Sequence, residues 1–484
     1  MAEFAWPTTA GGKASTTATG KQVWAAAARA MGADDLAAAL EREKDWRFKY
    51  PTHVVALCER MCASPAAAVD AARGGLAAAH AAFDTANVLA AATPPLHSVL
   101  VAGSGKAGEV KVPLASLDAW VAAGSCEADV AARCRSLCDE GGRLACEPST
   151  RRSHAFVVLG ATSEMGPARA LLSLGCTVAC VARAGSAAKW APLVDFARST
   201  SGVLVAPSRD EAATGADAGK LGADVLNEAG AIAAWLRDEP ALAKFDTLVV
   251  GQYIYLDGEK HVRASVACDA IAAELQKTRD VAYAYLASPG TAYPITAAMA
   301  DDSRRRHAAA PLWQTGLSGA MKLGGGGYVR NYRDAVGPAR LHVTDGLATV
   351  QGPNYALAKT LQNWRAVAAR ADGRVVSANM APPARTASMT KTNPNVARWL
   401  DGVANFAPNA TFFPQDVSKV MAALLLYDLW HPEAVAKPTT ALDHPLMILQ
   451  PAFHGGSPRC AYTGESIGSS AVITSFVSRR PSCA

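Results

Sequence analysis

The sequence has few charged residues. Asp, Glu, Lys and Arg make up 18% of its 484 residues, whereas 50% are hydrophobic. Soluble domains carry about 25% charged residues, so this chain can build a large core, and general disorder is excluded. The net charge is only +5 and no long run of Lys or Arg concentrates it, so the composition does not support nucleic-acid binding. At roughly 100–200 residues per domain, the length favours two or three domains.

Long apolar runs are also missing. No stretch reaches the ~18 uncharged apolar residues of a membrane-spanning helix, and we expect no membrane span. The start, Met1-Ala2-Glu3-Phe4, lacks the basic and apolar regions of a secretory signal. The segment up to Lys21 is rich in Ser, Thr, Gly and Ala and poor in acids, so an organelle transit peptide stays open beside a cytoplasmic location.

The 11 cysteines lack the pattern of a disulfide framework, and in a long chain their odd number indicates a reducing compartment. Four of them cluster between Cys126 and Cys146, without C-x-x-C spacing. We interpret these four as thiols on a helical hairpin rather than as a zinc site. No metal site is predicted.

Residues 1–150 are expected to form a mainly helical N-terminal domain of unknown role. Helical patterns run from 22 to 92, a short strand is predicted at 97–101, and further helices continue to about Cys146. The stretch 147–152, Glu-Pro-Ser-Thr-Arg-Arg, has the composition of a linker.

Residues 151–484 are expected to form an α/β domain. The apolar run 155–159 is followed by the turn 160–166, a helix over 168–174 and a second apolar strand over 176–182. This β-turn-α-β order is typical of a mononucleotide-binding half, and apolar strands without alternation fit a parallel sheet buried on both faces. Further strands are predicted at 203–206, 247–250, 340–343 and 374–378, with helices between them, so we expect a doubly wound parallel sheet.

Two motifs in this domain carry chemistry. Gly160 and Gly166 would let the chain turn tightly and approach a pyrophosphate at a helix N-terminus. Tyr355 and Lys359 lie four residues apart in a predicted helix, so the phenol and the ammonium share one face. A neighbouring ammonium favours the phenolate and would lower the pKa of Tyr355, which suits a general acid or base.

In this order the pieces resemble the short-chain dehydrogenase/reductase (SDR) family, over about residues 153–386, as a divergent member with an extra N-terminal helical region. The family's T-G-x-x-x-G-x-G motif is matched by Leu159, Gly160, Glu164 and Gly166, and its Y-x-x-x-K by Tyr355 and Lys359. Its strand with a catalytic Ser is matched by His342-Val343-Thr344, and its P-G-x-x-x-T by Pro382, Pro383 and Thr386.

The resemblance implies a Rossmann fold and an NAD(P)-dependent oxidoreductase, such as a ketoreductase or an alcohol dehydrogenase acting on a small carbonyl or alcohol. It implies Tyr355 as the acid/base, Lys359 as its partner and Thr344 as the substrate-orienting hydroxyl. Arg183 ends the second strand, where a cation can pair with a 2′-phosphate, which favours NADP over NAD. The residues implied in cofactor binding are Gly160, Thr162, Ser163, Met165, Gly166, Arg183, Pro382 and Thr386. Homo-oligomers are common for this fold, although the N-terminal region could instead cover the surface through which they usually form.

Several departures from the family pattern support a second interpretation. Glu164 replaces the middle glycine, and Val-Val-Gly-Gln-Tyr stands at 249–253 where the family has N-N-A-G. No Asn stands in the helix predicted over 266–286, where the family has a proton-relay Asn. An insertion at about 288–338 carries Trp313, Gly324 to Gly327 and Tyr328, and it is either a lid over the substrate or a surface excursion or oligomer contact. The alternative to an enzyme is therefore a degenerate SDR fold that serves as a structural or binding subunit.

Overall fold

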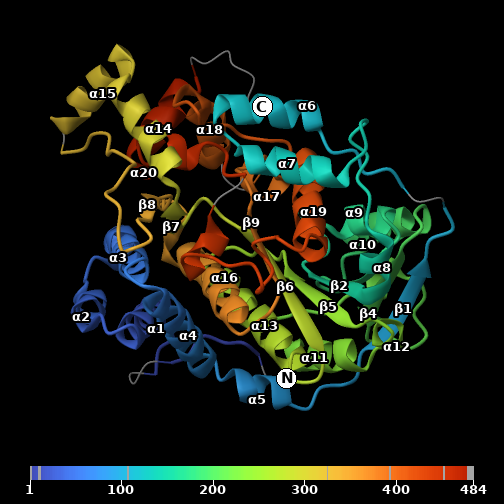
Figure 1. The fold of residues 1–484 in the computed structure, drawn as a ribbon. Coiled ribbons are helices and arrows are strands. Elements are labelled where there is room, and N and C mark those ends of the chain that lie inside the picture. The colour runs from blue at the N-terminus through green and yellow to red at the C-terminus, as the bar shows by residue number, and fades with distance from the viewer. Residues whose placement is uncertain are drawn as a thin grey trace.

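A seven-stranded sheet forms the centre of the computed structural model, which describes residues 3–8, 12–105, 108–323, 325–391, 394–450 and 453–476 (Figure 1). Its strands are β1 (His97–Ala102), β2 (His154–Leu159), β3 (Thr177–Val181), β4 (Val203–Ser208), β5 (Thr247–Gln252), β6 (Asp280–Ala287) and β9 (Val376–Met380). They lie in the order β1-β4-β3-β2-β5-β6-β9, and all pairs are parallel except β1 with β4. The expected α/β class with a mostly parallel sheet is confirmed.

The order from β4 to β9 matches the 3-2-1-4-5-6 order of doubly wound folds. In such folds the chain leaves the first strand toward one edge and later returns to its other side. Here that first strand is β2, and the switch point lies between β2 and β5. Ligands of doubly wound sheets bind beside this switch point, at the carboxyl ends of the strands.

The apolar strands have no alternation because both faces of the sheet are covered. In β2, Ala155, Val157 and Leu159 belong to the core on one face, whereas Phe156 and Val158 belong to the core on the other. Each of these five side chains is at most 1% exposed. Burial on both faces therefore explains why this segment reads as a continuous apolar run.

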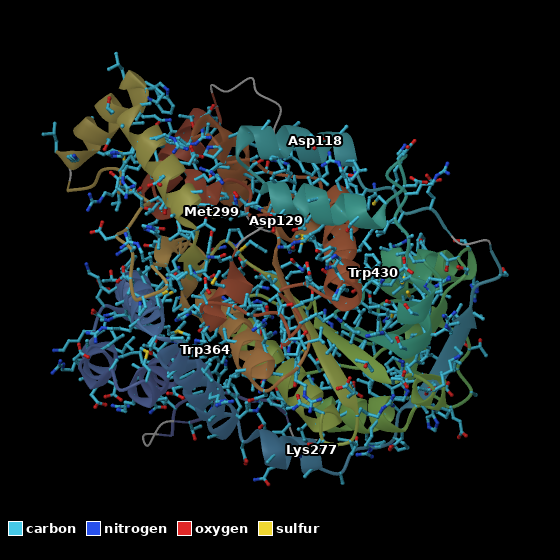
Figure 2. The ribbon with its side chains drawn as sticks, viewed as in Figure 1. Asp118, Asp129, Lys277, Met299, Trp364 and Trp430 are labelled. Carbon is cyan, nitrogen blue, oxygen red and sulfur yellow. The ribbon has the colours of Figure 1, made fainter. Side chains whose placement is uncertain are left out.

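Helices from both halves of the chain cover the first face. Trp24 of α1 and Trp364 of α16 meet edge to face, with ring centroids 5.3 Å apart, and Trp364 lies on the side of α16 next to the N-terminal helices (Figure 2). A Cβ on Gly75 of α4 would lie 2.2 Å from the Trp364 ring, so the close packing of α4 on α16 requires glycine there. The helices of this face are α1 (Thr16–Ala30), α2 (Asp34–Arg42), α3 (Trp46–Met61), α4 (Pro65–Ala82), α5 (Thr85–Ala90), α11 (Ala229–Asp238), α12 (Pro240–Ala243), α13 (Glu259–Leu275) and α16 (Gly352–Ala371).

The second face is covered by helices on both sides of residue 150 as well. Trp120 of α6 stacks on Phe453 at 5.2 Å between ring centroids and meets Phe412 edge to face at 5.0 Å. The helices of this face are α6 (Leu114–Ala123), α7 (Ala128–Leu137), α9 (Ala168–Ser173), α10 (Ala187–Arg198) and α19 (Pro414–Trp430).

The insertion packs with the C-terminal region into a smaller cluster beside the sheet (Figure 1). Trp313 and Tyr328 both meet Phe406 edge to face, at 5.3 and 5.6 Å between ring centroids, and Tyr328 also contacts Tyr462. Gly324 lies outside the described residues. The elements of this region are β7 (Ala292–Ile295), α14 (Ala297–Ala308), α15 (Leu312–Lys322), β8 (His342–Asp345), α17 (Ala387–Thr390), α18 (Pro394–Gly402) and α20 (Gly464–Thr474).

Two sequence predictions are wrong at the centre of the domain. The helix expected over 266–286 ends at Leu275, and residues 280–287 form β6, the fifth parallel strand. The strand expected at 340–343 is β8, which pairs with β7 in a separate two-stranded sheet. Alanine, a strong helix former, alternates with tyrosine in β6, so propensity favoured helix while burial against β5 and β9 imposes a strand.

The N-terminal region shares the core of the sheet. One hydrophobic cluster contains Phe4, Trp24 and Leu76 together with Val157 and Leu449. The stretch 147–152, expected as a linker, belongs mostly to the short helix α8 (Pro148–Ser153). The boundary drawn at 150 therefore separates two stretches of sequence but not two cores.

Candidate active site

Polar residues gather at the carboxyl edge of the sheet, where the parallel strands end. Gly160 follows β2, Gln252 ends β5 and Ser288 follows β6. The segment 382–386 comes shortly after β9. These positions flank the switch point between β2 and β5, which is where doubly wound folds bind their ligands.

Tyr355 lies against Ser288 at this edge. The Tyr355 hydroxyl and Ser288 Oγ are 2.7 Å apart and share a hydrogen bond, and Ser288 Oγ also accepts a bond from the Gly290 N–H at 3.1 Å. Ser288 is 9% exposed and Tyr355 is half-buried. Two hydroxyls held within 3 Å of each other can both bond the same substrate oxygen, which is the arrangement that proton transfer requires.

Lys359 lies one helical turn after Tyr355 on α16. Its ammonium donates to the carbonyl oxygen of Leu286 at 3.2 Å and to Gln362 Oε1 at 3.1 Å. Burial lowers the pKa of Lys359 to about 8. The contact with Leu286 ties the lysine to the end of β6, two residues before Ser288.

The pKa of Tyr355 moves in the direction opposite to our expectation. Burial raises it, and the hydrogen bond with Ser288 offsets only part of that effect. We expected the ammonium of Lys359 to lower it, but burial of the phenol dominates. Tyr355 is therefore protonated at neutral pH and suited to donate a proton rather than to accept one.

Two further rings surround Tyr355. His261 of α13 stacks on it with ring centroids 5.7 Å apart and planes at 21°, and Tyr255 contacts both rings. His261 is 1% exposed, and neither of its ring nitrogens has a hydrogen-bond partner within the described chain. Burial and the nearby charge of Lys359 lower the pKa of His261 to about 3, so the imidazole is neutral. The sequence singled out neither ring, since a lone His in a helix carries no motif.

Thr344 is not brought to this site. It lies on β8, fully buried, and its hydroxyl donates to Asn331 Oδ1 at 3.0 Å. The structure places Ser288 in the position that the sequence analysis gave to Thr344. The sequence could have identified Ser288 by its position directly after a strand, but that strand was predicted to be part of a helix.

The glycine turn is held tightly against the neighbouring strand. Gly160 has φ +99°, and a Cβ there would lie 2.5 Å from the backbone nitrogen of Ile254, so only glycine suits this position. Its N–H donates to the Val181 carbonyl at 2.8 Å. Gly166 is buried at the end of the turn, and its carbonyl accepts a bond from Ser418 at 3.2 Å.

Three side chains around this turn have polar groups to offer a ligand. Thr162 and Ser163 are half-buried, and Arg183 is exposed two residues beyond the end of β3. None of the three side chains hydrogen-bonds to another described residue. Met165 is half-buried against the core of the second face.

Glu164 joins the glycine turn to the segment after β9. Its Oε1 accepts a hydrogen bond from the Ala387 N–H at 3.0 Å. Thr386 Oγ1 lies 3.0 Å from Ser388 Oγ, and Pro382 is buried. The structure thus brings together the two sequence motifs expected to border a dinucleotide.

Most of these groups suit the binding of a dinucleotide through its phosphates. The hydroxyls of Thr162 and Ser163 could donate to a diphosphate, and the guanidinium of Arg183 could pair with a 2′-phosphate. The carboxylate of Glu164 opposes such a ligand, because it places a like charge beside the diphosphate.

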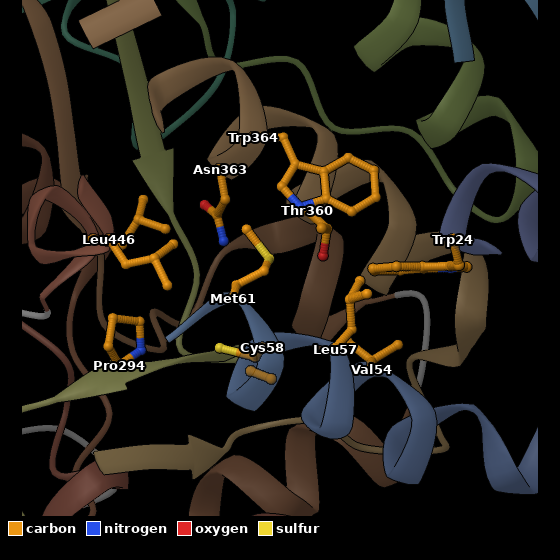
Figure 3. Close-up of a pocket in the computed structure, with 12 residues that line it drawn as sticks. Trp24, Val54, Leu57, Cys58, Met61, Pro294, Thr360, Asn363, Trp364 and Leu446 are labelled. Carbon is orange, nitrogen blue, oxygen red and sulfur yellow. The ribbon is translucent and has the colours of Figure 1, made fainter. Parts of the chain in front are cut away.

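A cavity of about 30 Å³ lies elsewhere, between α3 and α16 (Figure 3). It is lined mainly by apolar side chains, including Trp24, Met61 and Trp364, with Thr360 and Asn363 from α16. Tyr355 and Lys359 do not line it. Its volume suits about one water molecule rather than a substrate.

Metal and membrane features are absent from the part of the chain that the structure describes. No group of three or more His, Cys, Asp or Glu side chains could hold a metal there, and its ten cysteines are free thiols. None of its helices combines the length and the apolar character needed to cross a bilayer.

Comparisons with known proteins give no match. No family model matches the chain, and no match was found among the curated proteins or the solved structures.

Proposed function

We propose that this protein is an NADP(H)-dependent oxidoreductase of the SDR type that reduces a carbonyl substrate. The observation that carries the proposal is the hydrogen bond between Ser288 and Tyr355 at 2.7 Å. Lys359 supports it from one helical turn away. Ser288, from the end of β6, meets Tyr355 and Lys359 of α16 at the edge where doubly wound sheets bind ligands.

In this proposal, Ser288 and Tyr355 hold the substrate carbonyl oxygen with two hydrogen bonds. A bound nicotinamide would supply the hydride. Tyr355, protonated because burial raises its pKa, donates its proton to that oxygen. Lys359 holds the end of β6 through Leu286 and keeps a positive charge near the phenolate that remains.

Arg183 supports NADP rather than NAD. Its exposed guanidinium follows β3, at the position where doubly wound folds place the group that reads the ribose. A guanidinium can bind a 2′-phosphate with two parallel hydrogen bonds. Replacement of Arg183 with Ala should therefore weaken binding of NADPH more than binding of NADH.

A titration followed by a carbonyl screen tests the proposal. The purified chain is titrated with NADPH and NADH, and binding is read by nucleotide fluorescence and thermal shift. Tyr355→Phe should bind NADPH normally but lose turnover, by a factor of about 10²–10⁴. Tyr255→Phe is the matched control, because it removes a neighbouring hydroxyl whose one hydrogen bond within the described residues goes to Asp257.

The second candidate is a structural or binding subunit with a degenerate site. It is favoured by Glu164, which bonds Ala387 across the cofactor motifs, and by the backbone of Ile254, which lies directly against Gly160. Failure of both nucleotides to bind at millimolar concentration would support this candidate and refute the reductase.

A further inference from the structure

The helix α15 buries two polar side chains and exposes apolar side chains at its two ends. Gln314 is 6% exposed and Ser318 is 8% exposed. Both are held by backbone groups: Gln314 donates to the Asn405 carbonyl and Ser318 accepts from the Tyr328 N–H. By contrast, Leu312 at the start of the helix is 89% exposed, and Leu323 just after its end is 93% exposed. Leu317 and Met321 pack inward in the ordinary way, so the exposed leucines at both ends of the helix are the unusual feature.

Exposed apolar side chains also occur at the end of α20, at Ile473 and Phe476. The Ser470 hydroxyl of α20 lies 3.6 Å from Met321 Sδ of α15, and the Thr463 N–H donates to the Val329 carbonyl at 2.9 Å. The two helices therefore lie side by side at one corner of the molecule, where α15 projects outward (Figure 1). We define the α15 surface as Leu312, Trp313, Leu323, Val329, Ile473 and Phe476, which are 43–93% exposed.

The α15 surface concentrates apolar side chains beyond a random scatter. Twelve large hydrophobic side chains are exposed in the described part of the chain, and six of them belong to it. Single exposed apolar residues need no explanation, whereas their concentration on one part of the molecule indicates a surface that meets another apolar phase.

Three cations lie beside the α15 surface, whereas the one acid of α20, Glu465, accepts hydrogen bonds from Thr349. Lys322 ends α15, Arg330 follows Val329, and Arg398 lies 4.5 Å from the centre of the Phe476 ring. None of these three cations pairs with an acid among the described residues. The helix α15 itself contains no Asp or Glu.

We propose that the α15 surface binds an anionic lipid bilayer from one side. Leu and Trp on the outward face, with Lys and Arg beside them, are the composition of an interfacial helix. Anionic headgroups would neutralise the unpaired cations. A second copy of the chain suits this surface less well, because a twofold contact would bring Lys322, Arg330 and Arg398 close to their own equivalents.

Sedimentation with vesicles tests the proposal on the full-length chain. Sucrose-loaded vesicles of phosphatidylcholine alone are compared with vesicles of phosphatidylcholine mixed with phosphatidylserine. We expect sedimentation only with the anionic vesicles, reversed by salt. The double variant Leu312→Gln/Leu323→Gln should weaken binding at least about tenfold, and Lys322→Gln should weaken it about fivefold.

Phe48→Gln is the matched control, because Phe48 is an apolar side chain of α3, 65% exposed, outside the α15 surface. It should bind the anionic vesicles as the unmodified chain does. All replaced side chains are exposed, so unchanged thermal unfolding verifies that each variant is folded. The proposal is overturned if the chain binds neither kind of vesicle, if Phe48→Gln loses as much binding as the leucine variant, or if the leucine variant instead converts a dimer into a monomer.

Discussion

Replacement of Lys359 by Met should change how stability depends on pH. The ordinary pKa of a lysine is 10.5, and burial lowers that of Lys359 to about 8 in the folded chain. Between these two values the unfolded chain holds the proton and the folded chain does not. Raising the pH through this window therefore stabilises the folded state, by about 3 kcal/mol in all for this one group. Below pH 8 the full penalty for burying the ammonium is present.

The variant lacks this titration, so the difference between the two proteins isolates it. At pH 7 the loss of the buried charge stabilises Lys359→Met. The loss of the hydrogen bonds to Leu286 and Gln362 costs about 1–3 kcal/mol at every pH. At pH 7, two opposing effects of similar size thus decide whether the variant has a higher or a lower free energy of unfolding than the unmodified chain. Its change between pH 8 and pH 10.5 is set by the titration alone, and it should favour the unmodified chain as the pH rises.

Urea unfolding at several pH values from 7 to 10 measures this difference directly. Tyrosines elsewhere in the chain titrate in both proteins and cancel when the two free energies of unfolding are subtracted. A difference that stays constant over this range would refute our assignment of Lys359 as a buried, destabilised cation. Lys359→Arg is the informative control, because a guanidinium stays charged throughout and should show no such change.

Four other substitutions test the site. Ser288→Ala should lower kcat roughly a hundredfold in an enzyme assay without unfolding the chain. Thr344→Val should leave kcat unchanged but lower the free energy of unfolding by about 1–3 kcal/mol, which urea unfolding would measure. Gly160→Ala should lower the free energy of unfolding by at least about 2 kcal/mol, because it combines a positive φ with a backbone clash. An unfolding free energy like that of the unmodified chain would contradict the turn geometry. Glu164→Gln should tighten NADPH binding up to roughly fivefold in a fluorescence titration, and weaker binding would show that its carboxylate supports the site.

The sequence was most informative where local pattern and tertiary packing agree. The run 155–159 and the strand after its glycine turn are largely apolar because both sheet faces are covered. Tyr355 and Lys359 share a helix, so their common face follows from spacing alone. The expected parallel sheet depended on these local signals.

The remaining parts of the site depended on long-range packing. Ser288 follows a strand in which alanine alternates with tyrosine, and only the pairing of that strand with β5 and β9 makes it extended. His261 reaches Tyr355 because α13 and α16 pack together, which no spacing in the sequence encodes. The direction of the Tyr355 pKa could not be predicted either, since it follows from burial of the phenol.

The shared core of the first sheet face has a consequence for synthesis of the chain on the ribosome. Phe4, Trp24 and Leu449 belong to one apolar cluster, so the helices made first complete their burial only after nearly the whole chain has emerged. The edge strand β1 likewise waits about a hundred residues for β4, since Ala102 pairs with Val203. Nascent chains of this protein therefore expose the side of α1–α4 that later meets α16 for most of translation, and we expect chaperones to protect it during that interval.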